Sequence, residues 1–490
     1  MFRFKGSSQR EGKETLFSNR DLRRIIIPLL LSQILSVLVG TIDTMMVSYA
    51  GEDAVSGVSL VSSLDVFLLI FFTSTIGGGA VVLSQSIGSK QYKEMHETAK
   101  QLLYIVTALA TVLTAVVSIF RVSLLSTLFG DADASVMQNA KEYMFFLALS
   151  YPFVAIQDGI GASFVASGNT RISLIVSMIL NVINIVMNAV LIYGVGIGAA
   201  GAAIATLIAR IFGAAIMLIL ILDKRRVIHI EKIFRYRPNI RIIKRILGIG
   251  IPNGLENAMF QFGRLLTQSL VSALGTAALA ANSVALGIAN FQYMTGNAFS
   301  SAMIVVVGTC VGAQKRRQAK RDSFKLLAFN YFVIWMVILA TLLFLNPIVD
   351  VYSLSDGSAK LAKQMLLLHS VFAATIWPVG FMLPSAFRAA GNVRFPMVVS
   401  MLSMWIFRVA GAYVCALETV SVFGLFSFPG LGMGIWGVWL AMIIDWVFRF
   451  AVYLIHYLRN KWLCLGLRVR LVSVKKKEKE KERDTASLSR

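Results

Sequence analysis

The residues of this chain best suited to bind an ion or a ligand are the polar side chains that lie inside long apolar stretches. Asp43 lies in the first such stretch. The fifth stretch carries three amides at positions i, i+3 and i+7, which share one stripe of a helix: Asn181, Asn184 and Asn188. Polar groups are costly in an apolar setting unless they bind a ligand, face water or join helices by hydrogen bonds. Asp43 is therefore either a cation or substrate site or a carboxylate at a water boundary. The amides either belong to such a site or connect helices.

The sixth and seventh stretches add a hydroxyl, an acid and a base. Thr206 either joins a polar site or hydrogen bonds back to its own helix. Glu256 lies one turn after Pro252, and Arg264 lies two turns further along a similar face. Glu256 is therefore a second candidate for cation or substrate binding, with Arg264 close enough to neutralise it.

Three further groups in the apolar stretches complete the set. Asp445 and Arg449 are four positions apart, so we predict an ion pair on one helix. Asp65 is a candidate cavity residue, and so is His369, the one titratable group in the stretch 364–386. The four histidines lie far apart and show no metal-ligand spacing.

The elements that carry these residues are predicted to be membrane-spanning helices. The chain is 57% apolar and 15% charged, with a mean hydropathy of +0.73, outside the usual balance of soluble domains. Stretches of about 20 apolar residues are long enough to cross a bilayer as helices, and they lack the alternation of membrane strands. Twelve are expected, at 25–47, 55–79, 99–120, 139–161, 172–193, 199–222, 246–272, 277–302, 325–346, 364–386, 396–416 and 433–457.

The distribution of charge predicts how these helices are oriented. The net charge is +22, and basic residues gather near the amino terminus, in alternate connections and in the tail. This alternation follows the positive-inside rule and predicts that both termini and the central connection are cytoplasmic. Because the basic residues lie in loops and not on one surface with stacking aromatics, we do not expect nucleic-acid binding.

The sequence contains two copies of one unit. Pro28 and Gly88 recur as Pro252 and Gly312, and both pairs are 224 positions apart (252 − 28 and 312 − 88). A period of this length indicates a duplicated domain, an arrangement found in transporters. We predict an N-terminal cytoplasmic segment (1–21), an N-terminal lobe (22–222), a basic cytoplasmic linker (223–245), a C-terminal lobe (246–458) and a basic cytoplasmic tail (459–490).

Other functional classes have no support in the motifs. The sequence has no G-x-x-x-x-G-K-S/T phosphate loop, so ATP hydrolysis through such a loop is not expected. The spans contain no recognisable pair of nucleophile and base and no recognisable set of metal ligands, so we do not expect an enzyme. A scaffold or receptor would not need polar groups inside its spans. A secondary transporter powered by an ion gradient is the class that remains.

Seven short motifs, taken in order, resemble those of a known family, the multidrug and toxic compound extrusion (MATE) transporters. This family belongs to the multidrug/oligosaccharidyl-lipid/polysaccharide flippase superfamily. The similarity runs from about residue 22 to residue 458. The motifs are Thr41–Met46 (TIDTMM), Ser84–Gly88 (SQSIG), Ala166–Arg171 (ASGNTR), Asn184–Asn188 (NIVMN), Gly198–Thr206 (GAAGAAIAT), Gly250–Glu256 (GIPNGLE) and Gly308–Gly312 (GTCVG).

The resemblance implies an all-α integral membrane protein with twelve transmembrane helices in two six-helix lobes related as a parallel repeat. It implies a multidrug efflux protein of the cell membrane that exports amphipathic, often cationic, small molecules by antiport with H⁺ or Na⁺. Membrane lipid surrounds such a protein, which needs no cofactor and no obligate protein partner. Family members place a cation site, with Na⁺ the only metal ion expected, at residues that match Asp43, Asn184, Asn188 and Thr206. Many also use a glutamate that matches Glu256.

Two departures from the family pattern bear on the coupling ion. Some members carry an aspartate where this chain has Asn188, and the amide removes one formal charge. Some also carry an aspartate in the tenth span, where this chain offers only His369. Both differences weaken a Na⁺ site, so we favour coupling to H⁺.

A flippase for a lipid-linked oligosaccharide or another glycolipid, from the same superfamily, is the alternative. Such a protein favours basic residues that can face a pyrophosphate. Three arginines in the spans, Arg210, Arg264 and Arg408, are compatible with an anionic ligand.

Overall fold

The computed structural model describes residues 15–463 except 131, 232, 234, 236, 353 and 423–425. Almost all of these residues are helical, which confirms the predicted helical class. Helices are required because a membrane-embedded backbone must satisfy its own polar groups. Most of the predicted segments 1–21 and 459–490 lies outside the described residues.

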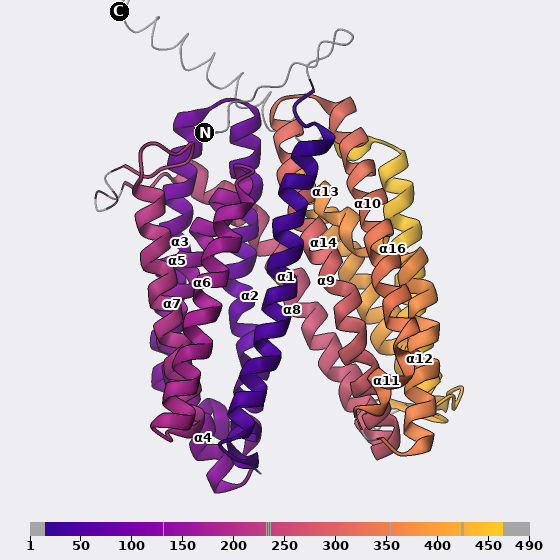
Figure 1. The fold of residues 1–490 in the computed structure, drawn as a ribbon. Helices are drawn as coiled ribbons and strands as arrows, with labels where there is room; N and C mark the ends of the chain where they lie inside the picture. Colours follow the sequence, from indigo (N-terminus) through magenta and orange to yellow (C-terminus); the bar gives the residue numbers. More distant parts are fainter. Residues whose placement is uncertain are drawn as a thin grey trace, which may run out of the picture. The chain divides into compact units, whose positions relative to one another are not determined.

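The first half of the chain is a bundle of long helices. In Figure 1, α1 runs beside α6, and α5 packs between α3 and α7. The helices are α1 (Asn19–Ser48), α2 (Glu52–Gly88), α3 (Tyr92–Phe129), α4 (Ala134–Leu149), α5 (Tyr151–Ala166), α6 (Thr170–Asn188), the π-helix η1 (Ala189–Gly194) and α7 (Gly198–Leu222).

The second half contains more interrupted helices. They are α8 (Ile240–Ala273), α9 (Thr276–Gly312), α10 (Arg316–Leu343), α11 (Leu345–Asp350), α12 (Asp356–Thr375), the π-helix η2 (Pro378–Met382), α13 (Leu383–Ala389), α14 (Arg394–Leu402), the π-helix η3 (Ser403–Ala410), α15 (Gly411–Ala416), α16 (Ile435–Leu458) and the 3₁₀-helix η4 (Lys461–Leu463).

The described residues include nine helices long and apolar enough to cross a membrane, or up to eleven if each of two bent pairs counts as one span. The bent pairs are α4 with α5, at 45°, and α12 with the segment Pro378–Ala389, at 62°. Proline lies in the first turn after both breaks, where its missing N–H costs no hydrogen bond. α8 covers the expected seventh span but is not among these apolar helices, so twelve spans stay a prediction.

Matching positions of the two sequence copies begin and end matching helices. α2 and α9 are both 37 residues long, and their bounds differ by 224 at each end (276 − 52 and 312 − 88). The residue before each helix is a glycine with positive φ, +102° at Gly51 and +106° at Gly275. Only glycine adopts this conformation without strain, which explains why both copies have it there.

The chain divides into two compact units. One comprises Met1–Phe262 and Tyr293–Val305, and the other comprises Gly263–Gln292 and Val306–Arg490. The division falls within α8 and α9 and not in the connection 223–245. The lobe boundaries expected from the sequence therefore stay a prediction.

Within the first unit, two glycines bring α2 and α8 into backbone contact. A Cβ atom on Gly78 would lie 2.5 Å from the carbonyl oxygen of Ile246, and one on Gly250 would lie 3.0 Å from the Cα of Thr75. Small residues allow helices in a membrane to approach this closely. The contact fixes the part of α8 that precedes Glu256 against α2.

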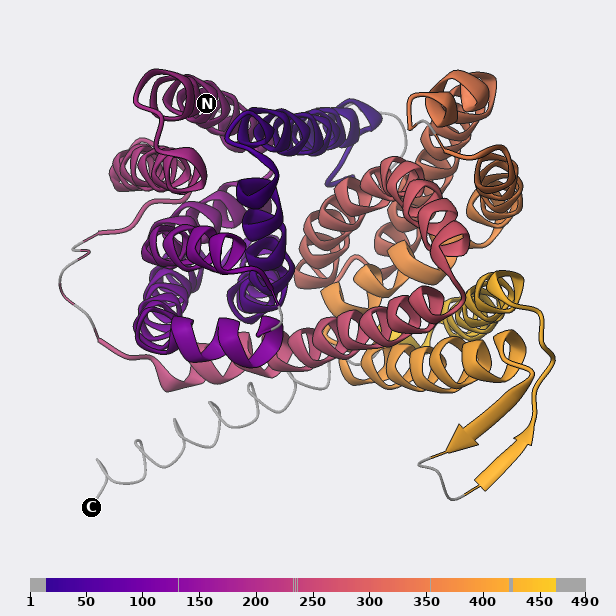
Figure 2. The same cartoon turned by 90° about the horizontal axis from the view of Figure 1, so that it is seen from below.

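Within the second unit, α16 is the central helix and packs against α15, η3 and η2. Its buried side chains include Trp439, Trp446 and Tyr453. A short antiparallel hairpin of β1 (Thr419–Val422) and β2 (Phe426–Pro429) lies in the connection before α16 and extends away from the helices of this unit (Figure 2). The sequence analysis did not predict these strands, although alternating β-branched residues favour such pairing.

Candidate functional site

Four of the predicted residues form one chain of hydrogen bonds in the first unit. Asn188 Nδ2 donates to Asp43 Oδ1 at 2.8 Å and to Asn184 Oδ1 at 3.4 Å. Asn184 Nδ2 donates to Thr206 Oγ1 at 3.4 Å, and the Thr206 hydroxyl donates to the carbonyl of Ala202 at 3.0 Å. The chain thus connects α1, α6 and α7, and its acid and nearest amide are 145 positions apart in sequence.

The end of α6 positions the two amides. Asn184 and Asn188 are four residues apart and therefore share a helix face, and they are 7% and 1% exposed. The π-helix η1 begins directly after Asn188, and π turns are frequent at functional sites because they change the register of a helix. Apolar side chains pack beside the chain of hydrogen bonds: Met46, Val47, Ala54, Ile192, Ala199 and Ala202.

Asn188 has one oxygen that the fold does not satisfy. Its Oδ1 is buried and has no hydrogen-bond partner, while its Nδ2 contacts two neighbours. Leaving a buried acceptor unsatisfied costs about 1–3 kcal/mol. An amide oxygen beside a carboxylate can accept a proton donor or ligate a hard cation such as Na⁺. In the described part of the chain, no group of three or more His, Cys, Asp or Glu side chains could hold a metal ion.

A second polar cluster in the first unit surrounds Arg210 of α7. Its Nη1 donates to Ser150 Oγ at 2.5 Å. Asp65 of α2 and Asp158 of α5 both lie close enough to interact with its charge. Tyr151 of α5 lies near Asp65, whose Oδ1 is buried without a hydrogen-bond partner. Two carboxyl groups therefore lie near one guanidinium, and Asp65 is half-buried between helices.

The sequence analysis missed Asp158. This residue lies inside the predicted span 139–161, so it is an acid in an apolar stretch, as Asp43 is. The signal that identified Asp43, an acid within an apolar stretch, could therefore also have identified Asp158. Its place near Arg210 was not predictable, because the two residues belong to different helices.

Three other candidates lie outside the chain of hydrogen bonds at Asp43. Asn181 is half-buried, one turn before Asn184. Glu256 is half-buried and belongs to the first unit, whereas Arg264 is exposed and belongs to the second. These two candidates therefore belong to different compact units, although they are two turns apart on α8.

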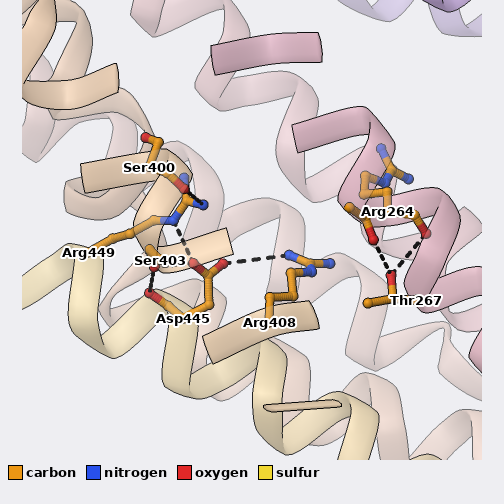
Figure 3. A network of polar contacts seen from close by, with 8 residues as sticks. Arg264, Thr267, Ser400, Ser403, Arg408, Asp445 and Arg449 are labelled. Atoms are coloured by element: carbon orange, nitrogen blue, oxygen red, sulfur yellow. Dashed lines mark hydrogen bonds and ion pairs between the residues drawn. The ribbon is translucent and has the colours of Figure 1, made fainter. Parts of the chain in front are cut away.

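The predicted ion pair of α16 is confirmed. It belongs to a network that contains more charged and polar groups than the two expected from the sequence (Figure 3). Arg449 Nε lies 2.7 Å from Asp445 Oδ1, and the Ser403 hydroxyl also donates to this oxygen. Arg449 Nη2 donates to the carbonyl of Ser400 at 3.0 Å. Arg408 Nη1 lies 3.8 Å from Asp445 Oδ2. One carboxylate of the second unit thus faces two guanidinium groups.

His369 lies in the packed interior of the second unit. It is fully buried, and its ring meets Trp446 and Trp439 edge-to-face with centroid distances of 5.2 and 6.0 Å. Aromatic edge-to-face pairs stabilise a core. The geometry around His369 is therefore that of aromatic packing.

Long apolar helices that enclose carboxylates, amides and guanidinium groups define a multi-pass helical membrane protein with a polar interior. The MatE family model matches residues 28–190 of this chain and matches again at residues 252–414. The chain belongs to the MatE family of transporters. The two matches start 224 positions apart (252 − 28), the same offset as the sequence copies.

Curated relatives cover nearly the whole chain. A probable multidrug resistance protein NorM from Thermotoga maritima is 24% identical over 450 residues, which are 90% of this chain and 93% of that protein. An uncharacterized transporter, YisQ, from Bacillus subtilis is 24% identical over 463 residues, 92% and 96% of the two chains. A solved outward-facing multidrug resistance MATE transporter has a TM-score of 0.80 at 18% identity, covering 93% of this chain and 96% of its own. That likeness concerns the fold alone.

Proposed function

We propose that this protein is a secondary active exporter of the cell membrane that moves amphipathic, often cationic, small molecules outward in exchange for H⁺ or Na⁺. The chain of hydrogen bonds from Asp43 to Thr206 carries the proposal, because a carboxylate inside a membrane protein marks an ion pathway. Family membership and the multidrug resistance names of relatives support the substrate class. The positive-inside pattern supports cytoplasmic termini, and the repeated helix bounds support two lobes of six helices.

The unsatisfied oxygen of Asn188 suggests how ion binding is sensed. An ionised Asp43 accepts from Asn188 Nδ2, whereas a protonated carboxyl can itself donate. A half-turn of the Asn188 amide would turn Oδ1 towards that proton, or towards Na⁺, and would remove the amide donor from Asp43. The bond from Asn188 to Asn184 would then change as well. Ion binding at Asp43 therefore alters the contacts between α1, α6 and α7.

Alternating access follows if the protein with an ion at Asp43 and the protein without it favour openings towards different sides of the membrane. An ion shifts a conformational equilibrium only through its different affinity for the two conformations. Linkage then makes ion and substrate affinities reciprocal, so each ligand weakens binding of the other. We favour H⁺ as the coupling ion, because an amide at Asn188 supplies an oxygen without a second formal charge.

Vesicle transport tests the proposal directly. The purified protein in liposomes should move a cationic dye against its gradient when a pH gradient or a Na⁺ gradient is imposed separately. Movement under one gradient, and its absence in protein-free liposomes, identifies an antiporter and its ion. A protein that moves no dye under either gradient would contradict the proposal and favour the flippase alternative, which the relatives' names do not favour.

The Asn188→Asp variant should strengthen cation binding. The new carboxylate would lie beside Asp43, where two like charges stay ionised together only if a cation sits between them. We expect Na⁺ to stimulate dye export at concentrations about tenfold lower than in the parent protein, equivalent to about 1.4 kcal/mol of added affinity. The measurement is initial dye export against Na⁺ concentration at fixed pH.

Asn181→Asp is the matched control, because it makes the same change on the same helix but away from the hydrogen bonds of Asp43. It should leave the Na⁺ dependence unchanged. Equal responses of the two variants would show that proximity to Asp43 is not what sets cation affinity.

A further inference from the structure

The connection between α7 and α8, together with the first turns of α8, forms a basic segment of the first unit, residues 223–245. The segment contains nine Lys or Arg residues and two acids. Both acids already lie beside bases of the segment: Asp223 Oδ2 is 3.4 Å from Arg226 Nε, and Glu231 Oε1 is 3.5 Å from Lys224 Nζ. The acids within the segment therefore do not neutralise its other bases.

Five basic residues of the segment are exposed, and we call them the basic patch: Arg225, Arg235, Arg237, Arg241 and Lys244. Within the part of the chain that the structure describes, none of their charged groups forms an ion pair or a hydrogen bond. The neighbouring Arg245 differs, because its Nη1 lies 2.7 Å from Glu94 Oε1. Clustered cations repel one another, and an anion that lies near several of them relieves this repulsion. The basic patch is therefore suited to an anionic partner.

Side chains of α3 hold this segment by its backbone. Lys100 Nζ donates to the carbonyl of Arg235 at 2.8 Å. Gln101 Nε2 donates to the carbonyl of Arg237 at 2.7 Å, and His96 Nδ1 lies 2.8 Å from a third carbonyl of the connection. Because these contacts use carbonyl oxygens, they fix the path of the chain and leave the guanidinium groups of both arginines available.

The same contacts place the segment at the depth where the apolar part of α3 begins. That apolar stretch is expected from residue 99, and the contacts come from residues 96–101. Figure 2 shows the connection running along the outer edge of the first unit on its way from α7 to α8. Its Ile228 and Ile230 are 1% and 3% exposed, so they pack inward while the basic patch is exposed. Exposed cations at the end of an apolar helix surface lie at the level of lipid head groups.

We propose that the basic patch binds anionic phospholipid head groups of the adjacent membrane leaflet, which the positive-inside pattern predicts to be the cytoplasmic one. Four of its five side chains are arginines, whose planar guanidinium can donate two parallel hydrogen bonds to a phosphate. Clusters of four to eight basic residues directly beside a membrane helix attract anionic lipids. Binding of lipid by this surface is separate from export, and it needs neither Asp43 nor an ion gradient.

Native mass spectrometry of the full chain measures this binding directly. The detergent-solubilised protein is titrated with phosphatidylglycerol or with phosphatidylcholine of the same acyl chains, and the dissociation constant of the first bound lipid is determined for each. The parent protein should prefer phosphatidylglycerol. The double variant Arg235→Gln with Arg237→Gln should weaken phosphatidylglycerol binding about 25-fold, which is a factor of about five for each cation removed. Binding of phosphatidylcholine should not change.

Arg317→Gln is the matched control, because Arg317 is an exposed arginine in the first turn of α10, in the second unit. This variant should bind both lipids as the parent protein does. Replacing Arg235 and Arg237 by lysine keeps both charges and should recover most of the affinity for phosphatidylglycerol. All three altered arginines are exposed, so every variant should unfold at the temperature of the parent protein.

Salt and a soluble phosphate complete the test. A higher ammonium acetate concentration should weaken phosphatidylglycerol binding more in the parent protein than in the double glutamine variant, because salt screens exposed charges. Equal affinity of the parent protein for the two lipids, or equal losses in the double variant and in Arg317→Gln, would overturn the proposal. Complete displacement of the lipid by millimolar glycerol phosphate would also overturn it, because the patch would then be a general anion site. None of these outcomes depends on whether the protein exports dye.

Discussion

The Asp43→Asn variant is expected to lose gradient-driven dye export completely, down to the rate of protein-free liposomes. Of the four described residues that form this chain of hydrogen bonds, Asp43 alone carries a carboxyl group, and an amide neither takes up a proton at neutral pH nor neutralises a cation. Without a group whose charge changes, ion binding cannot favour one conformation over another. The imposed ion gradient can then no longer drive the conformational change of the protein.

The substitution should preserve the fold. The amide oxygen introduced at position 43 can still accept from Asn188 Nδ2, so the connection between α1 and α6 remains. Expression, monodispersity and thermal unfolding of the purified variant should therefore match those of the parent protein. This separates loss of coupling from loss of structure.

Asp53→Asn provides the matched control for this measurement. Asp53 is an exposed acid in the first turn of α2 in the same unit, and the same change there should leave export intact. Dye export at the parent rate by Asp43→Asn would remove this carboxylate from the mechanism. Asp65 and Asp158, which lie near Arg210, would then be the next candidates for the ion-binding carboxylate.

The Asp445→Asn variant is expected to cause the largest loss of stability. The change removes a buried negative charge that lies 2.7 Å from Arg449 and 3.8 Å from Arg408 in the second unit. Breaking a buried ion pair from one side costs about 3–5 kcal/mol, because the remaining charge is left uncompensated. The new amide would also turn its NH2 donor either towards Arg408 or towards the donors Ser403 and Arg449, depending on its orientation.

Thermal unfolding of the detergent-solubilised protein measures this loss. Asp350→Asn is the control, because it breaks an ion pair with Lys363 in which the acid is 67% exposed, and such pairs contribute about 0–1 kcal/mol. Combining Asp445→Asn with Arg449→Gln should recover part of the stability, since the guanidinium that lies 2.7 Å from the lost carboxylate is then removed as well. If Asp445→Asn unfolds at the same temperature as Asp350→Asn, the network is not a stabilising element.

Several features of this protein followed from the sequence because they depend on local order along the chain. The apolar stretches predicted helices, since a bilayer forces a backbone of this composition to bond within itself. The pair of Asp445 and Arg449 was predictable because residues four apart on one helix meet without help from the rest of the fold. The common offset of α2 and α9 followed from the repeat, because the repeated positions Gly88 and Gly312 end these two helices.

The candidate cation site could not be predicted from the spacing of residues in the sequence alone. Periodicity placed Asn184 and Asn188 on one stripe, and the family resemblance added Asp43 and Thr206. Only the packing of α1, α6 and α7 shows that these four side chains reach one another. Hydrogen bonds across 145 positions have no local signature in a chain.

Tertiary structure alone decided the partners of the other buried charges. Arg210 meets Ser150, 60 positions away, and lies near Asp65 and Asp158. Arg408 joins Asp445 through the π-helix η3, whose wider turns shift side chains off the i, i+4 register that sequence reasoning assumes. The enclosure of His369 by two tryptophans likewise depends on how α12 packs on α16. Sequence determined which residues had to be buried, and the contacts between helices decided which of them neutralise one another, because charge pairing depends on distance in space.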